Sequence, residues 1–344
     1  MNFEALYSKL PEFIRYNNYI LDFFLRIPKK FEKFNKKSKI IKSQNEVINL
    51  LFSSYELKST GTLRNMQLLY LELMKFIDNV CKKYQIDYWI ADGTLLGAVR
   101  HGGFIPWDDD VDFAIMRKDY NKLIKVLPKE LLKHEYLKKE CGISLLRENH
   151  ENYFKDFNSV YDFEDENGLL DEEKFLFLQI AWLKPYVKID FFPKDFVRED
   201  KLGYFEKNYV STKYKFNHEI KNGKKFFDDE IKIKNDDIGF TLDKTKYFND
   251  GLDTLQLTKV WLFETDEVFP LSTISFENID FKCPKNPDHW LTVSYGKDYM
   301  QLPNTIETHN ITQFIETQFS SKEEMNKKFK QSIEYLREIN DNFY

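Results

Sequence analysis

The feature that most constrains the fold is the stretch of residues 93–115, "GTLLGAVRHGGFIPWDDDVDFAI", in which a glycine-containing turn precedes a cluster of aspartates. Alternate side chains of a β-strand share a face, so Asp110 and Asp112 point one way while Val111 and Phe113 point into a core. Two carboxylates on one face repel each other unless a positive charge lies between them. A solvated acidic loop is the alternative for an isolated Asp-x-Asp, but the apolar strand and the preceding turn favour a cation site.

The turn at Gly93 has the features of a phosphate-binding loop. Gly93 allows a ligand to approach the backbone closely, and the N–H groups that open the next helix at Thr94 favour anions. Arg100, about two helical turns later, is placed to reach a phosphate or a carboxylate. A glycine between a strand and a helix is ordinary by itself. Followed by the aspartate strand, it predicts Mg²⁺ (or Mn²⁺) bound together with a phosphate group.

Asp190 is the third candidate carboxylate. It lies between Ile189 and Phe191 in "VKIDFFP" (187–193), which predicts a strand beside the first two. In a functional role, Asp190 completes the metal site or accepts the proton of an attacking hydroxyl. In a structural role, it caps the strand end or pairs with Lys188 or Lys194.

Other candidates surround these carboxylates. Trp107 either stacks on a base or sugar or anchors the loop by packing. His101 fits a hydrogen-bonding role in the loop better than a catalytic one. Asp108 and Asp109 either support the metal ligands or contact the molecule that carries the attacking hydroxyl. Closure over a nucleotide is expected of a later segment that contains Lys297, together with Tyr295, Gly296 and Tyr299.

Composition limits the class of protein. The chain has 344 residues, of which 42% are hydrophobic, so a large core is available. A net charge of −5 argues against broad binding to nucleic acid. The three cysteines are far apart and predict neither a zinc site nor a disulfide framework, which fits a reducing compartment. Without a signal-peptide pattern or an apolar run of about 18 to 20 residues, we expect a soluble cytoplasmic protein.

Three regions are expected along the chain: a helical extension over residues 1–60, a catalytic domain over 61–304 and a helical C-terminal segment over 305–344. Residues 1–45 mix aromatic side chains with a run of lysines. They either pack on the core or lie on the cytoplasmic face of an anionic membrane. Acidic stretches at 155–174 and 227–253 are expected to be irregular surface insertions.

Local patterns predict the elements around the candidate site. Apolar residues at three- and four-residue spacing predict a helix ending near residue 84. Strands are expected at 86–91, 109–116 and 186–192, the last ended by Pro193. Helices are expected at 94–101 and 118–127, the latter closed by Pro128. The tail from Ile311 predicts one or two charged amphipathic helices.

The stretch Gly93–Leu123 resembles the LicD/fukutin family within the nucleotidyltransferase fold. Weaker matches at 188–195 and 295–303 extend the resemblance over about residues 65–303. Thr94 departs from the Gly-Gly or Gly-Ser of most nucleotidyltransferases but suits this branch. The resemblance implies an α+β fold, with a small mixed sheet flanked by helices and helical extensions at both ends. The zinc-binding cysteine cluster of some members is not expected here.

The resemblance also implies an activity. Such enzymes transfer a phospho-alcohol, such as phosphocholine or ribitol phosphate, from a CDP-activated donor to a hydroxyl of a cell-surface glycan and release CMP. Lipopolysaccharide, capsule and teichoic acid are acceptors of this kind. Asp110, Asp112 and Asp190 would hold the metal, and Gly93 and Thr94 would contact the diphosphate. Two alternatives stay open: a true nucleotidyltransferase that releases pyrophosphate, and a non-catalytic scaffold that binds a nucleotide or a partner.

Overall fold

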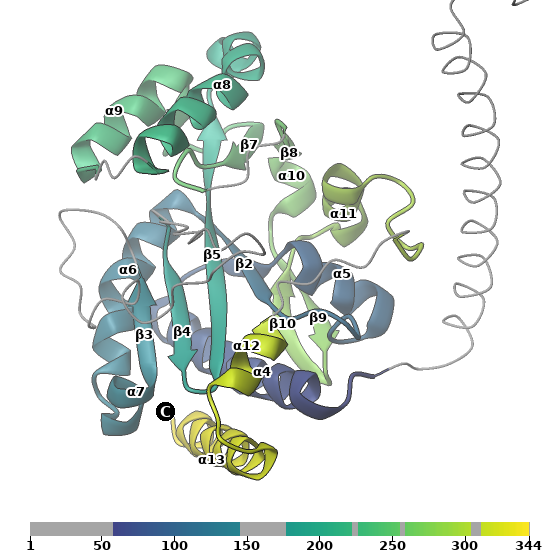
Figure 1. Cartoon of the computed structure of the whole chain (residues 1–344). Coiled ribbons are helices and arrows are strands. Elements are labelled where there is room, and N and C mark those ends of the chain that lie inside the picture. Colours follow the sequence, from purple (N-terminus) through teal and green to yellow (C-terminus); the bar gives the residue numbers. More distant parts are fainter. Residues whose placement is uncertain (1–57, 145–176, 222–225, 255–258, 304–310, 344) are drawn as a thin grey trace, which may run out of the picture. The chain divides into compact units, whose positions relative to one another are not determined.

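The computed structural model describes residues 58–144, 177–221, 226–254, 259–303 and 311–343. The chain divides into two units, and the fold below is that of the unit formed by residues 58–300 and 307–344 (Figure 1). Residues 1–57 of the predicted N-terminal extension, including the segment expected to contact a membrane, lie outside the described residues, as does the acidic stretch 155–174. The predicted domain boundaries stay predictions.

A mixed β-sheet forms the centre of this unit. Its strands follow the order β1 (Tyr88–Ile90), β2 (Val111–Met116), β5 (Tyr186–Val197), β4 (Gln179–Leu183) and β3 (Cys141–Ser144). The β2–β5 pair is parallel, and the other neighbours are antiparallel. The end of β5 also pairs with β6 (Phe240–Thr241) and β7 (Tyr247–Asp250), and β7 pairs with β8 (Phe263–Glu264). A separate hairpin joins β9 (Ser272–Phe276) and β10 (Ile279–Cys283).

Helices surround the sheet, which confirms the predicted α+β class with a flanked mixed sheet (Figure 1). The C-terminal tail, predicted to form one or two helices, contains α12 and α13. The helical elements are α4 (Gly61–Tyr84), α5 (Asp92–His101), α6 (Arg117–Leu131), α7 (Glu135–Glu140), η2 (Glu199–Lys201), α8 (Leu202–Lys221), α9 (Asp228–Ile238), α10 (Thr265–Val268), α11 (Pro287–Tyr295), α12 (Ile311–Thr317) and α13 (Lys322–Asp341).

Helix α4 ties the sheet to the C-terminal helices. Of the apolar residues whose spacing predicts this helix, Met74, Phe76, Ile77 and Val80 are fully buried. The helix contacts α6, α12, α13 and β5, and Figure 1 shows α13 beside it. This packing buries one face of the sheet and leaves the opposite face of β2 for the aspartates.

The prediction that Pro193 ends its strand is wrong, because β5 continues to Val197. Strand β4 pairs with residues up to Asp190, and β7 begins to pair at Lys194. Pro193 lies in the gap between these two partners, where its missing N–H removes no ladder hydrogen bond. Its carbonyl oxygen accepts a hydrogen bond from Gly251 N–H at 2.8 Å.

Two other expectations are corrected. Helix α6 continues through Pro128 to Leu131, because Leu127 and Leu131 are both fully buried and this packing outweighs the lost backbone bond. The acidic stretch 227–253 is not an irregular insertion, since it contains α9, β6 and β7. Its apolar residues Phe240 and Phe248 are buried.

Two features relate to the predicted cellular compartment: the state of the cysteines and the character of the helices. Cys81, Cys141 and Cys283 are free and buried. In the part of the chain that the structure describes, none of the helices has the length and apolar character needed to cross a bilayer.

Candidate functional site

Asp112 and Asp190 face each other across the parallel pair of β2 and β5. The register of this ladder places Asp112 directly opposite Asp190. Both are largely buried, with 9% and 7% of their surfaces exposed. Asp110 lies two residues before Asp112, just ahead of β2, and is partly exposed. The fold therefore brings all three predicted carboxylates to the same end of the β2–β5 pair.

The turn before α5 is attached directly to this strand. The Thr94 hydroxyl accepts a hydrogen bond from the backbone N–H of Asp112 at 2.9 Å. On the other side, the N–H of Ala91 donates to the carbonyl oxygen of Asp112 at 3.0 Å. A side chain at position 93 would come within 3.1 Å of a carboxylate oxygen of Asp108, so glycine lets the turn lie against this loop. Gly93 and Thr94 are thus beside the aspartates, where the sequence predicts them.

The carboxylate of Asp112 lies in an unfavourable electrostatic setting. Burial raises its pKa well above the usual value, and the charges of neighbouring acids raise it further, in the order Asp110, Asp92, Asp190 and Asp108. Within the described residues, no hydrogen bond reaches its side-chain oxygens. A buried anion in such a setting is stabilised by a bound cation.

Asp190 has two partners of its own. Gln179 Nε2 donates to one carboxylate oxygen at 2.7 Å, and Lys188 Nζ lies 3.0 Å from the other. Burial acts to lower the pKa of Lys188, but the charge and hydrogen bond of Asp190, together with the charges of Tyr186 and Asp110, raise that pKa overall. The ion pair with Lys188 matches the structural role considered for Asp190.

These partners bear on how a divalent cation would fit. Across the described ranges, no group of three His, Cys, Asp or Glu side chains is arranged to hold one metal ion. Asp110 and Asp112 suit a Mg²⁺ ion that takes its other ligands from water and substrate phosphate, which is how Mg²⁺ is commonly bound. Each carboxylate oxygen of Asp190 already has one partner, Gln179 or Lys188, and its role as a third metal ligand stays a prediction.

Two polar side chains of α4 position the loop before β2, and the sequence analysis missed both. Gln67 Nε2 donates to the carbonyl oxygens of Ile105 and Asp108, at 3.2 and 3.0 Å. The hydroxyl of Tyr70 donates to the carbonyl oxygen of Asp109 at 3.2 Å and accepts from the N–H of Lys188 at 3.1 Å. Tyr70 therefore links the loop before Asp110 to the strand that carries Asp190.

Asp92 and Tyr295 also face the carboxylates. Asp92 opens α5 with a φ of 43°, in the left-handed region that non-glycine residues rarely adopt. Burial raises its pKa to about 6, and Lys194 opposes this shift. Tyr295 is 47% exposed, yet partial burial and the charges of Asp92 and Asp112 raise its pKa well above the usual value. In the sequence, the position of Asp92 directly before Gly93 in "ADGTLLG" is the signal that points to this acid.

The remaining predicted residues lie around this centre rather than within it. Arg100 Nη1 donates to the carbonyl oxygen of Tyr299 at 3.1 Å, and its Nε donates to His101 Nε2 at 3.0 Å. The ring of Trp107 contacts that of His101, edge to face, with centroids 6.1 Å apart. Lys297 is exposed just after α11. Their predicted roles toward a nucleotide stay predictions.

Asp109 has a structural contact. Its side chain is 3% exposed, and one carboxylate oxygen accepts a hydrogen bond from the N–H of Ile311, at the first residue of α12, at 3.2 Å. Asp108 instead faces the Gly93 turn. The two acids that the sequence analysis did not separate thus have different neighbours.

Comparison with known proteins shows what this chain is similar to. Residues 85–232 match the family described as "LicD/FKTN/FKRP, nucleotidyltransferase domain". The lipopolysaccharide cholinephosphotransferase LicD of Haemophilus influenzae is 40% identical over 85 residues, which cover 25% of this chain and 31% of that protein. An uncharacterized protein of Rickettsia typhi is 34% identical over 150 residues, or 42% of this chain and 38% of the relative.

The human ribitol 5-phosphate transferase FKRP is 44% identical over 48 residues, which cover 14% of this chain and 10% of that protein. The matched part is thus well under half of each of these relatives. The family match includes the turn at Gly93 and the aspartate strand, because it begins before β1 and extends beyond β5. Residues 85–232 of this chain therefore form a nucleotidyltransferase domain of the LicD/fukutin family.

Proposed function

We propose that this protein transfers a phospho-alcohol from a CDP-activated donor to a hydroxyl of a glycan and releases CMP, in a reaction that depends on Mg²⁺ or Mn²⁺. The observation that carries the proposal is the carboxylate of Asp112. It is buried among four other aspartates, and no described group donates a hydrogen bond to it. The names of the relatives, a cholinephosphotransferase and a ribitol 5-phosphate transferase, support this class of substrate.

In the proposed reaction, Asp110 and Asp112 hold the metal ion, which when bound neutralises charge on the donor diphosphate. The backbone at Gly93 lies close to the phosphates, since no side chain intervenes. The Thr94 hydroxyl accepts the N–H of Asp112 and so can donate its own proton to a phosphate oxygen. Arg100 is a candidate phosphate ligand at the far end of α5, where its charge and that of Asp108 interact.

Asp190 is the proposed acceptor of the proton from the attacking glycan hydroxyl. Its position opposite Asp112 puts its carboxylate beside the reacting phosphate in this scheme. Gln179 and Lys188 hold the carboxylate in place, so the contact with Lys188 must loosen before Asp190 takes a proton. In the proposed complex, the Trp107 ring and the side chain of Lys297 contact the nucleotide.

The test is product identification. The protein is incubated with Mg²⁺, a glycan acceptor and either CDP-choline, CDP-ribitol or CTP, with a chelator control and the Asp110→Asn variant. We expect CMP and a phospho-alcohol-modified glycan, both lost with chelator and in the variant. A different outcome would contradict the proposal: CTP gives pyrophosphate and a CMP-modified acceptor, and no CDP-alcohol reacts. The protein would then be a nucleotidyltransferase. Nucleotide binding without turnover would favour the scaffold.

A further inference from the structure

A cavity of about 440 Å³ lies between α6, α9 and the segment that contains β6. Its apolar lining consists of the side chains of Ile124, Ile231, Phe240 and Leu242. Ile124, Ile231 and Phe240 are buried, whereas Leu242 is 60% exposed. The space is therefore open to solvent on one side and closed by apolar groups within. None of its lining residues has a role in the proposed reaction.

The strand register separates this cavity from the candidate site. Asp195 of β5 lines the cavity, and Asp190 stands five residues earlier in the same strand. Side chains an odd number of residues apart point to opposite faces of a strand, and five residues span about 16 Å. Arg117, which also lines the cavity, follows the last residue of β2. The cavity thus lies at the opposite end of the β2–β5 pair from Asp112 and on the other face.

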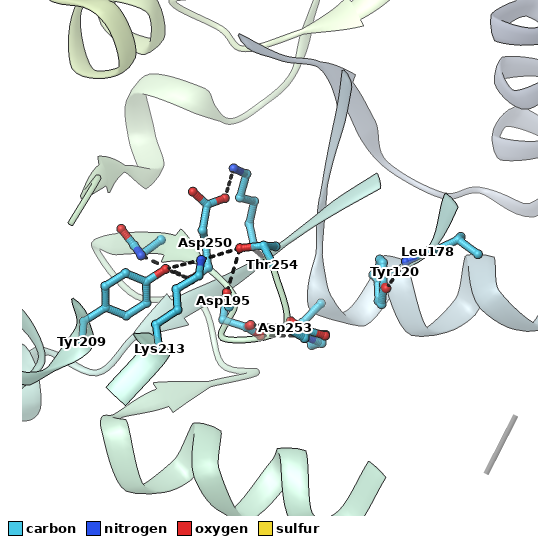
Figure 2. Close-up of polar contacts among 12 residues, drawn as sticks. Tyr120, Leu178, Asp195, Tyr209, Lys213, Asp250, Asp253 and Thr254 are labelled. Carbon is cyan, nitrogen blue, oxygen red and sulfur yellow. Dashed lines mark hydrogen bonds and ion pairs between the residues drawn. The ribbon is translucent and has the colours of Figure 1, made fainter. Parts of the chain in front are cut away.

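Two of the lining residues, Arg117 and Asp195, belong to a buried ion cluster. They are 7% and 2% exposed, and Asp253, the third member, is 1% exposed. The Arg117 guanidinium donates to both oxygens of Asp195, at 2.8 and 2.6 Å, and to both of Asp253, at 2.8 and 2.7 Å. Figure 2 shows Asp195 and Asp253 close to Thr254 and Lys213. Because these two carboxylates already engage the guanidinium, Arg117 does not favour an anionic ligand in the cavity.

The lining has an excess of negative charge. Five of its side chains are aspartates, and three are basic. The exposed aspartates Asp229, Asp236 and Asp243 form no ion pair with any residue in the part of the chain that the structure describes. Asn235 adds a hydrogen-bond acceptor, since its Oδ1 is buried and no described group donates to it. A cation that carries N–H groups would meet both needs.

An organic cation suits this cavity better than a metal ion. Over the described ranges, no three His, Cys, Asp or Glu side chains are placed to hold one ion. The aspartates are instead contributed by both α9 and the residues after β6, with apolar side chains between them. Carboxylates spread in this way match positive charges spread along a ligand, and the apolar walls cover its methylene groups.

We propose that this cavity is a second ligand site, which binds an aliphatic amine with two or more ammonium groups separated by methylenes. Asp229, Asp236 and Asp243 pair with the ammonium groups, and Asn235 accepts a hydrogen bond from one of them. The methylenes lie against the apolar walls, including Leu242. The site is independent of the proposed function, because neither the metal nor the donor uses these residues.

Isothermal titration calorimetry with 1,6-diaminohexane tests this site without any measurement of turnover. We expect saturable binding of the diamine and none of 1,6-hexanediol, which has the same chain without the charges. Asp229→Asn combined with Asp236→Asn should weaken binding of the diamine by about fivefold or more, because two carboxylates that face the ligand are lost. Both positions are exposed, so the variant should fold as the wild type does.

The matched control removes two exposed charges outside the cavity, by Asp237→Asn combined with Asp280→Asn. Asp237 is next to Asp236 on α9, so this variant measures general attraction of a cation to the protein. It should weaken binding by less than about twofold. Asp112→Asn should bind the diamine as the wild type does. No saturable binding to the wild type, equal weakening in the cavity and control variants, or loss of binding in Asp112→Asn would each overturn the inference.

Discussion

The Tyr70 hydroxyl joins the carbonyl oxygen of Asp109 to the backbone N–H of Lys188, at 3.2 and 3.1 Å. These two backbone groups are 79 residues apart in sequence and stand next to Asp110 and two residues before Asp190. One buried side chain of α4 thereby fixes how the two aspartate-bearing segments lie against each other.

We expect Tyr70→Phe to lower the stability by about 1 to 3 kcal/mol, because two buried backbone groups lose a partner. It should also lower turnover, since the loop before Asp110 is released from β5. Tyr120→Phe is the matched control: Tyr120 is buried and its hydroxyl accepts the N–H of Leu178 at 2.6 Å. Urea unfolding should show a loss in both variants, and steady-state kinetics a marked loss only for Tyr70→Phe. Equal kinetic effects would contradict the positioning role of Tyr70.

Asp112→Asn should abolish turnover while leaving the stability without metal unchanged or higher. Burial and neighbouring carboxylates raise the pKa of Asp112 in the folded protein, so its ionised form destabilises the fold. The stability that protonated Asp112 contributes is fully present below the pKa of this group in the unfolded chain, about 4. It is lost as the pH rises through the higher pKa that the group has in the folded protein. The variant should therefore gain on the wild type as pH rises.

Thermal unfolding at several pH values, with and without Mg²⁺, checks this expectation. Mg²⁺ should stabilise the wild type and have little effect on Asp112→Asn. Asp280→Asn, at an exposed position of β10, is the control and should keep the Mg²⁺ response. A full Mg²⁺ response in Asp112→Asn would remove Asp112 from the metal site.

Lys188→Met should destabilise the protein by about 1 to 3 kcal/mol, because it leaves Asp190 without its cation. The loss is expected to be smaller than the ~3 to 5 kcal/mol of a fully buried pair, since the lysine is 21% exposed. With Asp190 uncompensated, added Mg²⁺ should stabilise this variant more than it does the wild type. Lys188→Arg keeps the charge and serves as the control in the same melting experiment. An unchanged Mg²⁺ response in Lys188→Met would show that Asp190 does not interact with the metal.

Gly97→Ala and Gly203→Ala should change stability in opposite directions. Both glycines are in helices, where alanine is favoured by about 0.5 to 1 kcal/mol. At Gly97 the added methyl would lie 2.5 Å from the carbonyl oxygen of Gly103, which is backbone and cannot move aside easily. At Gly203 no atom lies within 4 Å. Denaturant midpoints should fall for the first variant and rise for the second. A higher midpoint for both variants would mean that the loop after α5, which contains Gly103, shifts to make room for the methyl group.

Local features of the sequence were enough to predict the elements that carry the site. Spacing of apolar residues predicts α4, and the alternation around Asp110 and Asp112 predicts β2 with its core-facing and open sides. These patterns succeed because side-chain periodicity depends only on residues close in sequence. The resemblance of Gly93–Leu123 likewise identified the family before any distance was known.

Tertiary structure alone decided which groups surround the aspartates. Whether Pro193 ends a strand depends on where β4 stops and β7 starts, which are segments remote in sequence. Segments remote in sequence also decide that Gln179 and Lys188 contact the two carboxylate oxygens of Asp190, and that Lys194 pairs with Asp250. The sequence offered both lysines as partners of Asp190, but side chains reach only a few ångströms. The choice between them is therefore made by strand register, which no local pattern contains.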